Sequence, residues 1–321
     1  MDLIYTDVNH DDVGVLKDYV FDLAFGTDEN DFELTLDLKN HCCVADCLLY
    51  IENTEYGGII DGIDVVTNED KLTYTGRTWH GILESKVIEP PSGEAYYTVS
   101  GEANDVIGTL LQKIGLSDLF TASEKDSGLV INDYSFDRFI GAYTGIVKML
   151  ATVSGKLNFA FTGNKVVISV LPIVDYSKDE QFDNDCVEME FEKTQNTVNH
   201  LICLGKGELT ERQVIHLYMD ENKNISKTQS LIGLKEVTAV LDFPNAESSE
   251  ELEKKGTEKF QELAVNDKVQ LNLVSEETVY DIGDIIGAKE LITETTASAK
   301  ITKKIVNISQ GEINIQYKVG E

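Results

Sequence analysis

The chain has 321 residues, with 57 Asp and Glu against 27 Lys and Arg, so its formal net charge at pH 7 is −30. Nucleic-acid binders gain much of their affinity from Lys and Arg that displace counterions, so this balance excludes a typical nucleic-acid binder. With 42% hydrophobic and 26% charged residues, the composition indicates a folded protein of two or more domains. The sequence contains no apolar run of about 20 residues and begins with no signal peptide, which predicts a protein made inside a cell without membrane insertion.

The cysteines are odd in number and not spaced as regular pairs, which predicts free thiols rather than a disulfide framework. The cluster His41-Cys42-Cys43-x-x-x-Cys47 could belong to a zinc site with His200 and Cys203 as remote ligands. It lacks the C-x2-C pair of structural zinc sites, however, and unreactive cysteine is readily buried, so we favour structural thiols. The five cysteines are Cys42, Cys43, Cys47, Cys186 and Cys203.

The first part of the chain has the pattern of short strands. Phe32 to Leu38 alternates apolar and polar residues, as a half-buried strand does. Further apolar segments from Cys47 to Gly76 are separated by Gly-rich and acidic turns. Pro90-Pro91 with Ser92-Gly93 breaks the pattern sharply. We therefore predict a β-barrel-like domain over residues 1–91.

The middle of the chain has helical spacing. Apolar residues recur at helical positions in 104–114, where Asn104 or Asp105 could cap the helix and Gly115 could end it, and again in 140–151. A strand near 128–134 and a hairpin over 156–171 complete the pattern. Residues 92–178 are thus predicted to form an α+β domain.

The last part is predicted to contain one long helix and a second β-barrel-like domain, over residues 179–321. Ser248 or Ser249 can cap the helix, whose apolar stripe includes Leu252 and Phe260. The fold class predicted for the whole chain is β-rich α+β, with two small β-barrel domains flanking an α+β middle domain. The strand candidates in this part are 198–204, 212–219, 268–274, 279–289, 299–309 and 312–319.

The common catalytic motifs are absent: the sequence contains no G-x-x-x-x-G-K-[ST], G-x-S-x-G or H-E-x-x-H. A hairpin turn explains Gly205-Lys206-Gly207 better than a phosphate-binding loop. Carboxylates are abundant enough that a two-carboxylate glycosidase stays open, although abundance makes that signal weak. We predict no catalytic, cofactor-binding or metal-binding residue, and hence no enzyme. Further groups interpreted as structural or solvated are His10, His80 and His216, and the acids Asp179, Glu180, Asp183 and Asp185, which lack a calcium loop.

Trp79, the only tryptophan, lies in Gly76-Arg77-Thr78-Trp79-His80-Gly81. Next to Arg77 it could anchor an interface, because Trp and Arg are enriched at interface hot spots. Trp is also highly buried on average in folded domains. We therefore favour a tryptophan that fills the core while Arg77 pairs with a nearby acid.

Three stretches of the sequence stand out together. They are the opening Leu3–Asp7 with Tyr19–Gly26 and Asn30–Phe32, the segment Gly76-Arg77-Thr78-Trp79-x-Gly81-x-Leu83 running to Pro90, and the closing Tyr280–Ile286 with Ile301–Val306. Together they resemble the tail hub proteins of Gram-positive phages, prophages and phage-derived bacteriocins. Their order and spacing extend the resemblance over nearly the whole chain. Within them, the candidates for a structural or assembly role are Gly76, Arg77, Trp79, Gly81, Gly283 and Asp284.

The resemblance implies a homotrimer at the tail tip or baseplate of a virion or phage-like particle, assembled in the bacterial cytoplasm. Such a hub adapts the six-fold tail tube to a three-fold spike, with the tube protein, the central spike and other baseplate proteins as partners. DNA would pass as a non-adherent passenger, which agrees with the negative charge. The chain ends just after the last predicted strand, so we expect no appended lytic domain. The alternative is a carboxylate-based cell-wall glycan hydrolase of a tail tip.

Overall fold

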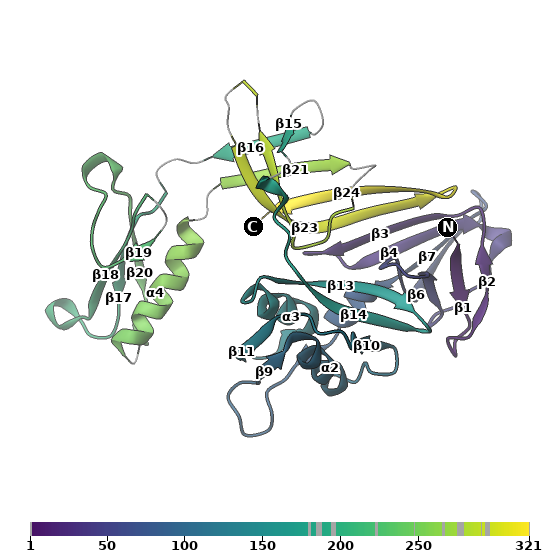
Figure 1. The fold of residues 1–321 in the computed structure, drawn as a ribbon, viewed down its shortest axis with the longest axis horizontal. Helices are drawn as coiled ribbons and strands as arrows, with labels where there is room; N and C mark the ends of the chain where they lie inside the picture. The colour runs from purple at the N-terminus through teal and green to yellow at the C-terminus, as the bar shows by residue number, and fades with distance from the viewer. Residues whose placement is uncertain are drawn as a thin grey trace. The chain divides into compact units, whose positions relative to one another are not determined.

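The computed structural model describes residues 2–178, 181–183, 188–193, 197–221, 224–246, 248–264, 267–274, 279–289, 291–292 and 296–320 (Figure 1). The described part is a β-rich α+β structure, which confirms the predicted class at that level. It divides into unit 1, residues 1–189 with 270–321, and unit 2, residues 190–269. No helix in the described residues has the length and apolar content needed to cross a membrane. Among the residues singled out above, Asp179, Glu180, Asp185 and Cys186 lie outside the described ranges.

A large, mostly antiparallel sheet joins the two ends of the chain. The neighbour order is β16-β21-β24-β23-β3-β4-β7-β6-β5-β1-β2, with β22 beside β23 and β15 parallel to β22. β23 pairs with β3 from Lys303 opposite Gly26 to Ser309 opposite Val20. The described pairings do not close into a barrel. The strands are β1 (Leu3–Thr6), β2 (Asp12–Leu16), β3 (Val20–Gly26), β4 (Asp31–Asp37), β5 (Leu48–Ile51), β6 (Gly57–Val66), β7 (Lys71–Thr78), β15 (Gln181–Asp183), β16 (Glu188–Lys193), β21 (Asp267–Val274), β22 (Ile285–Lys289), β23 (Thr296–Ser309) and β24 (Glu312–Gly320).

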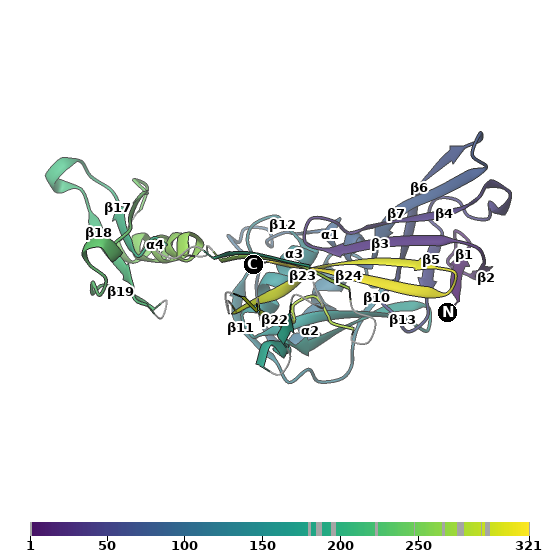
Figure 2. The same cartoon turned by 90° about the horizontal axis from the view of Figure 1, so that it is seen from above.

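The predicted alternation is visible in β4, where Phe32, Leu34 and Leu36 are buried and Asp31, Glu33 and Asp37 are exposed. β6 runs unbroken from Gly57 to Val66 and pairs with β7 on both sides of a bulge between Ile60 and Gly62, where the register shifts. β6 and β7 form a long hairpin (Figure 2), in which β6 continues beyond the residues Gly57–Ile59 that pair with β5. The short 3-10 helix η1 (Leu38–Asn40) follows β4.

Residues 79–178 build the rest of unit 1 around two helices on a small sheet of order β10-β14-β13. The apolar face predicted for the first helix is buried, and Gly115 has the expected left-handed φ of +73°. The helix cap was predicted wrongly: Glu102, whose longer side chain reaches the Asp105 N–H at 3.0 Å, caps it instead of Asn104 or Asp105. The elements are α1 (Trp79–Glu84), β8 (Val87–Ile88), β9 (Thr98–Glu102), α2 (Ala103–Lys113), β10 (Phe120–Ala122), β11 (Val130–Ser135), β12 (Ile140–Gly141), α3 (Ala142–Ala151), β13 (Gly155–Thr162), β14 (Lys165–Pro172) and η2 (Tyr176–Lys178).

Unit 2 is a four-stranded sheet of order β19-β18-β17-β20 with α4 packed on one face. Leu252 and Phe260 of α4 bury against Leu201 and Leu217, as the predicted stripe requires. Ser248 caps the helix by accepting the Glu251 N–H at 3.1 Å. The elements are β17 (His200–Leu204), η3 (Leu209–Glu211), β18 (Val214–Met219), β19 (Ile225–Ser226), η4 (Gly233–Lys235), β20 (Thr238–Asp242) and α4 (Ser249–Ala264).

The strand predicted over 279–289 begins only at Ile285. Before it, Tyr280 to Asp284 forms a turn in which Gly283 has a φ of +104°. A side chain rarely adopts this backbone conformation, so glycine permits the turn and the strand cannot extend back through it.

Candidate functional site

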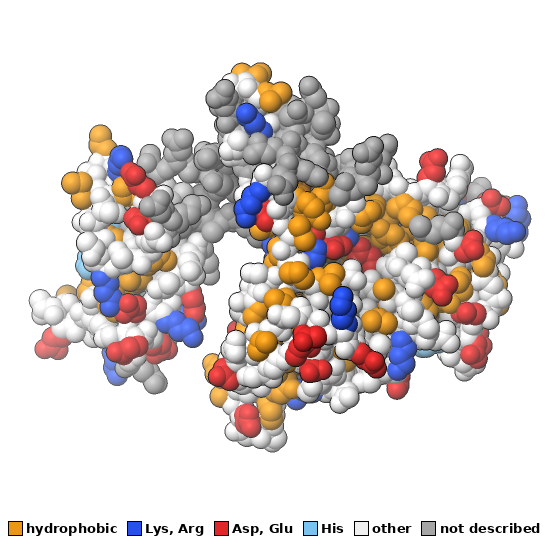
Figure 3. Space-filling model, viewed as in Figure 1, with side chains coloured by type: hydrophobic (Ala, Val, Ile, Leu, Met, Phe, Trp, Pro, Cys, Tyr) orange, Lys and Arg blue, Asp and Glu red, His pale blue; other side chains and the backbone are white. Residues whose placement is uncertain are grey.

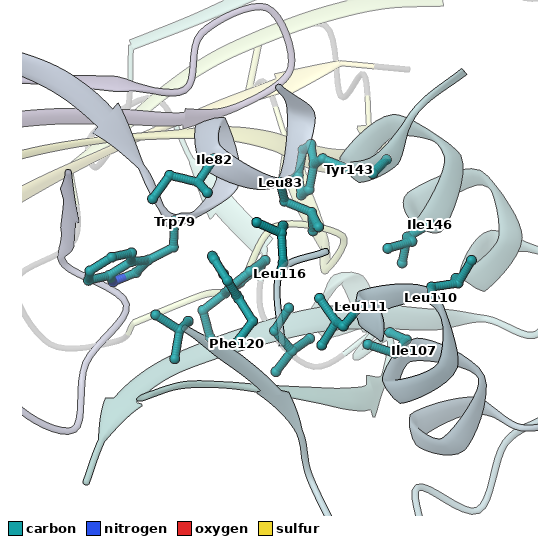
Figure 4. Packing of buried hydrophobic residues seen from close by; sticks show 14 of the residues in the cluster. Trp79, Ile82, Leu83, Ile107, Leu110, Leu111, Leu116, Phe120, Tyr143 and Ile146 are labelled. Carbon is teal, nitrogen blue, oxygen red and sulfur yellow. The ribbon is translucent and has the colours of Figure 1, made fainter. Parts of the chain in front are cut away.

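Trp79 opens α1 and is completely buried. Its ring stacks on Phe161 of β13 at a centroid distance of 5.6 Å and meets Phe120 of β10 edge-on at 6.5 Å. It shares a core with the α2 residues Ile107 and Leu111 (Figure 4). The interpretation of Trp79 as a core residue is confirmed. Trp79 joins the N-terminal strands to the middle segment rather than filling one β unit alone.

Arg77 lies at the surface beside this core and connects β6 to the end of α1 by hydrogen bonds. Its guanidinium donates Nε–H to Asp61 Oδ2 at 2.8 Å and a second hydrogen bond to Asp61 Oδ1 at 2.7 Å. A third hydrogen bond, 3.1 Å long, reaches Ser85 Oγ just after α1. The predicted pairing with a nearby acid is confirmed, and because both partners are partly exposed the pair orients the segment more than it stabilises it.

Gly76 and Gly81 allow close backbone approach. A Cβ atom on Gly76 would lie 2.0 Å from the Ile59 carbonyl oxygen, and one on Gly81 would lie 2.1 Å from the Asn30 carbonyl oxygen. Both oxygens belong to the main chain, so they cannot avoid an added Cβ atom by a change of side-chain rotamer. The two glycines therefore fix how tightly β7 and α1 approach β6 and the loop after β3.

We expect Gly81→Ala to lower the free energy of unfolding by about 1 to 3 kcal/mol, because the added methyl group overpacks a rigid contact. Gly108→Ala is the matched control. It also lies in a helix, but the nearest atom to its new Cβ would be Ala122 Cβ at 3.5 Å. Urea unfolding of both variants measures the difference. Gly108→Ala should be neutral or more stable by about 0.5 to 1 kcal/mol, and equal effects at the two positions would contradict the close approach.

Asp284 lies at the centre of a buried ion-pair network. Its two carboxylate oxygens accept hydrogen bonds from Lys156 Nζ at 2.6 and 2.7 Å, and from the backbone N–H groups of Val174 and Asp281 at 2.9 and 3.0 Å. The Asp284 side chain is 1% exposed and that of Lys156 is 5% exposed. Gly283 forms the turn that points the carboxylate inward.

The network continues to Lys304 of β23. Lys156 Nζ also bonds to Asp281 Oδ2 at 2.8 Å, and Lys304 Nζ bonds to Glu55 Oε1 at 2.6 Å and Asp281 Oδ1 at 3.4 Å. Burial opposes ionisation of Asp281, but Lys304 and Lys156 outweigh it and lower the pKa of that carboxyl. Burial alone would lower the pKa of Lys304, whereas Glu55 and Asp281 raise it. The network thus connects four segments by ion pairs. They are β13, the turn that precedes β22, the strand β23, and the turn that follows β5.

Sequence reasoning missed Lys156, Lys304, Glu55 and Asp281. A signal existed for Lys304, because it stands in phase with the buried Val306 and Ile308 of its strand. A lysine at an inward strand position indicates a buried acidic partner, and Glu55 supplies it from a distant part of the sequence, at 2.6 Å.

A cavity of about 580 Å³ lies beside the network in unit 1. His80 of α1, Tyr143 of α3, Lys156 and Gly283 are among the residues that line it. The segments around Trp79 and Asp284 thus meet at one cavity through His80 and Gly283.

His80 is a buried histidine held among aromatic rings. Its imidazole stacks on Phe25 at 4.7 Å and lies 4.1 Å from the Phe159 ring centroid. Its Nδ1 atom has no hydrogen-bond partner. Burial, with a further contribution from the charge of Lys304, lowers the pKa of His80 to about 3. The ring is therefore neutral at physiological pH, which agrees with a structural role.

This burial predicts an acid-sensitive fold. Between the ordinary pKa of 6.5 and the folded pKa of about 3, the unfolded chain binds a proton at His80 and the folded chain does not. The free energy of unfolding therefore falls with falling pH, by up to about 1.4 kcal/mol per unit. We expect His80→Phe to remove about 2 kcal/mol of the loss in free energy of unfolding between pH 6.5 and pH 4.5.

Urea unfolding across this pH range measures the effect, and His10→Gln in an exposed turn is the control for loss of a histidine. A His80→Phe protein with the same pH slope as the unmodified chain would contradict the assignment.

The remaining chemical candidates are dispersed. No group of three or more His, Cys, Asp or Glu in the described part of the chain is placed to hold a metal ion. His200 Nε2 lies 2.8 Å from His216 Nδ1, and His200 Nδ1 lies 2.7 Å from Glu236. Gly205 to Gly207 lies in the loop between the antiparallel strands β17 and β18, as predicted, rather than at a helix N-terminus.

Comparison with solved structures is decisive for the fold. No protein-family model matches the chain, and no curated protein matches it significantly in sequence. The fold is similar to that of the 43 kDa tail protein of prophage MuSo2 from Shewanella oneidensis, with a TM-score of 0.59 at 11% identity, covering 99% of this chain and 98% of that one. The chain has a phage tail protein fold.

Two other tail proteins have similar structures. A prophage tail protein from Listeria monocytogenes EGD-e gives a TM-score of 0.58 at 10% identity, covering 99% of this chain and 94% of the other. The tail protein from Neisseria meningitidis MC58 gives 0.53 at 12% identity, covering 100% and 96%. The similarity to tail proteins expected from the sequence is thus confirmed at the level of the fold.

Proposed function

We propose that this chain is the tail hub of a phage or phage-tail-like particle, at its tail tip or baseplate. In this role a homotrimer adapts the six-fold tail tube to a three-fold spike. The observation that carries the proposal is the match of the whole chain to phage tail proteins, which covers 98% of the MuSo2 tail protein. The same likeness supports a structural role without catalysis.

The pairing of β3 with β23 supports a hub with two β-barrel-like parts, one from residues 1–91 and one from the last part of 179–321, around the α+β segment 92–178. Seven strands of the first part and six of the last belong to one sheet, in which the two parts meet where β3 pairs with β23. Three copies of two such parts would present six similar modules to a six-fold tube. Free edges would then be paired between subunits, since a closed array leaves no exposed edge.

Charge supports a passage for DNA. The net charge is −30, and acidic side chains are spread over the face seen in Figure 3 with the basic ones between them. Like charge repels the phosphate backbone, so DNA would slide past without adhering. The partners in this proposal are the tail tube protein, the central spike and other baseplate proteins, and the site of action is the assembled particle.

The free edge at β2 gives a test of assembly. β2 ends the sheet, and Val13 and Val15 on it are 57% and 45% exposed. We expect the double variant Val13→Lys, Val15→Lys to fold normally but to lose trimers, because lysine on an edge strand prevents pairing with another chain. Size-exclusion chromatography and negative-stain microscopy with co-expressed tube and spike proteins measure the loss.

The control is Val130→Lys, at a residue 54% exposed on β11 outside the large sheet, which should assemble normally. Unchanged assembly of the β2 variant would contradict edge pairing at this strand. Clearing of purified cell wall in a zymogram, lost on mutating one pair of carboxylates, would instead favour the glycan hydrolase.

A further inference from the structure

The segment from His41 to Cys47, between η1 and β5, carries three thiols at one place on the fold. Cys42 is exposed, while Cys43 and Cys47 are buried. The Sγ atoms of Cys42 and Cys43 are 3.5 Å apart. An exposed thiol therefore stands beside a protected one.

Tyr74 of β7 holds this pair in position. Its hydroxyl oxygen accepts the backbone N–H groups of Cys42 and Cys43 at 3.1 and 3.0 Å, and it lies 2.9 Å from His41 Nδ1. The Tyr74 side chain is completely buried. The rigid sheet thus fixes the backbone of both cysteines.

The surroundings favour a thiolate at Cys42. The hydrogen bond from the Cys43 thiol lowers the pKa of Cys42, burial opposes this, and the Tyr74 hydroxyl lowers the pKa further. The same contact, together with burial, raises the pKa of Cys43. Thiols that are accessible, ionised and placed next to a second cysteine are those that respond to oxidants.

We propose that Cys42 and Cys43 form a redox-responsive thiol pair that reacts with low-molecular-weight disulfides. The Cys42 thiolate attacks one sulfur of the disulfide RS–SR, so that a Cys42–SR bond forms and RS⁻ leaves. Cys43 then gives up its proton and attacks the Cys42 sulfur, which closes a Cys42–Cys43 disulfide and releases the second RS⁻. The protein loses two hydrogen atoms, and RS–SR is reduced to two molecules of RSH.

The closed pair is expected to be easily reversed. Neighbouring Cα atoms are about 3.8 Å apart, closer than in most disulfides, and strained disulfides are the readily reduced ones. Because Tyr74 of β7 bonds to the backbone of both cysteines, we expect disulfide formation to alter its contacts with the β6–β7 hairpin.

The experiment treats the full chain with oxidised glutathione at pH 7 and maps the products by peptide mass spectrometry. All proteins carry Cys186→Ser, because that cysteine lies outside the described residues. We expect loss of two hydrogens in the Cys42–Cys43 peptide, reversed by reduced glutathione. Cys43→Ser should trap glutathione on Cys42, and Cys42→Ser should abolish both products.

Cys203, buried in unit 2, is the internal control, and we expect Cys42 to react at least about tenfold faster, because the thiolate is the reacting species. Equal rates at Cys42 and Cys203 would overturn the proposal. A Cys43→Ser protein that accumulates no mixed disulfide, or that closes a disulfide to Cys47, would overturn the role of Cys43.

Tyr74→Phe tests the positioning separately, since it keeps the buried ring and removes only the hydroxyl. The readout is the pH dependence of Cys42 alkylation by iodoacetamide. We expect the midpoint to move to higher pH, because the thiolate loses a donor. An unchanged midpoint would show that Tyr74 does not act on the thiol.

Discussion

Asp284→Ala is expected to lower the free energy of unfolding by about 3 to 5 kcal/mol, because it leaves the buried Lys156 ammonium without its main partner. Both side chains are almost inaccessible, and two oxygens of Asp284 contact Lys156 Nζ within 2.7 Å. Two backbone N–H groups also lose their acceptor. Urea unfolding followed by circular dichroism measures the loss.

The matched control is Asp137→Ala, which removes an exposed carboxylate from its 3.0 Å pair with Lys148. Exposed pairs contribute about 0 to 1 kcal/mol, so little change is expected. The double variant Lys156→Met, Asp284→Leu should be more stable than Asp284→Ala, because it removes the unpaired buried ammonium, but less stable than the unmodified chain, because the N–H groups of Val174 and Asp281 still lack their acceptor. Equal stability of Asp284→Ala and Asp137→Ala would contradict the buried network.

Trp79→Ala is expected to cost about 3 to 5 kcal/mol, because removing a large aromatic side chain leaves a cavity in a packed core. The cavity would open between α1 and the strands that carry Phe120 and Phe161. Particle assembly should fail with it, since the core joins the N-terminal strands to the middle segment. Thermal unfolding and electron microscopy of particles measure the two effects.

Tyr96→Ala is the control for loss of a large aromatic residue, because Tyr96 is 54% exposed. Trp79→Phe should fall between the two, since it retains part of the ring contact. A Trp79→Ala protein that forms particles with unchanged thermal stability would show that the ring does not support this core.

The local structure could be predicted because its causes are local. Alternation in β4, helical spacing in α2 and α4, and the turn between β13 and β14 are each determined within a few residues. The burial of Trp79 and the ion pair of Arg77 could be predicted because tryptophan is usually buried and arginine usually pairs with a nearby acid. The turn at Gly283 was missed because apolar residues on both sides imitate a strand.

The pairing of β3 with β23 could not be predicted, because it joins residues such as Leu23 and Val306 that are far apart in sequence. The burial of Lys156 and Lys304 depends in turn on that arrangement, since their partners Asp284 and Glu55 come from other segments. The polar half of the candidate site is thus a product of tertiary structure, whereas its apolar half was visible in the sequence.

The proposed hub is a trimer, so the absolute mass of the protein in solution distinguishes it from a monomer. Light scattering on the purified chain, alone and with co-expressed tube and spike proteins, gives that mass. We expect a mass three times the chain mass of 35.7 kDa. A mass of 35.7 kDa at every concentration, also with the tube and spike proteins present, would contradict it.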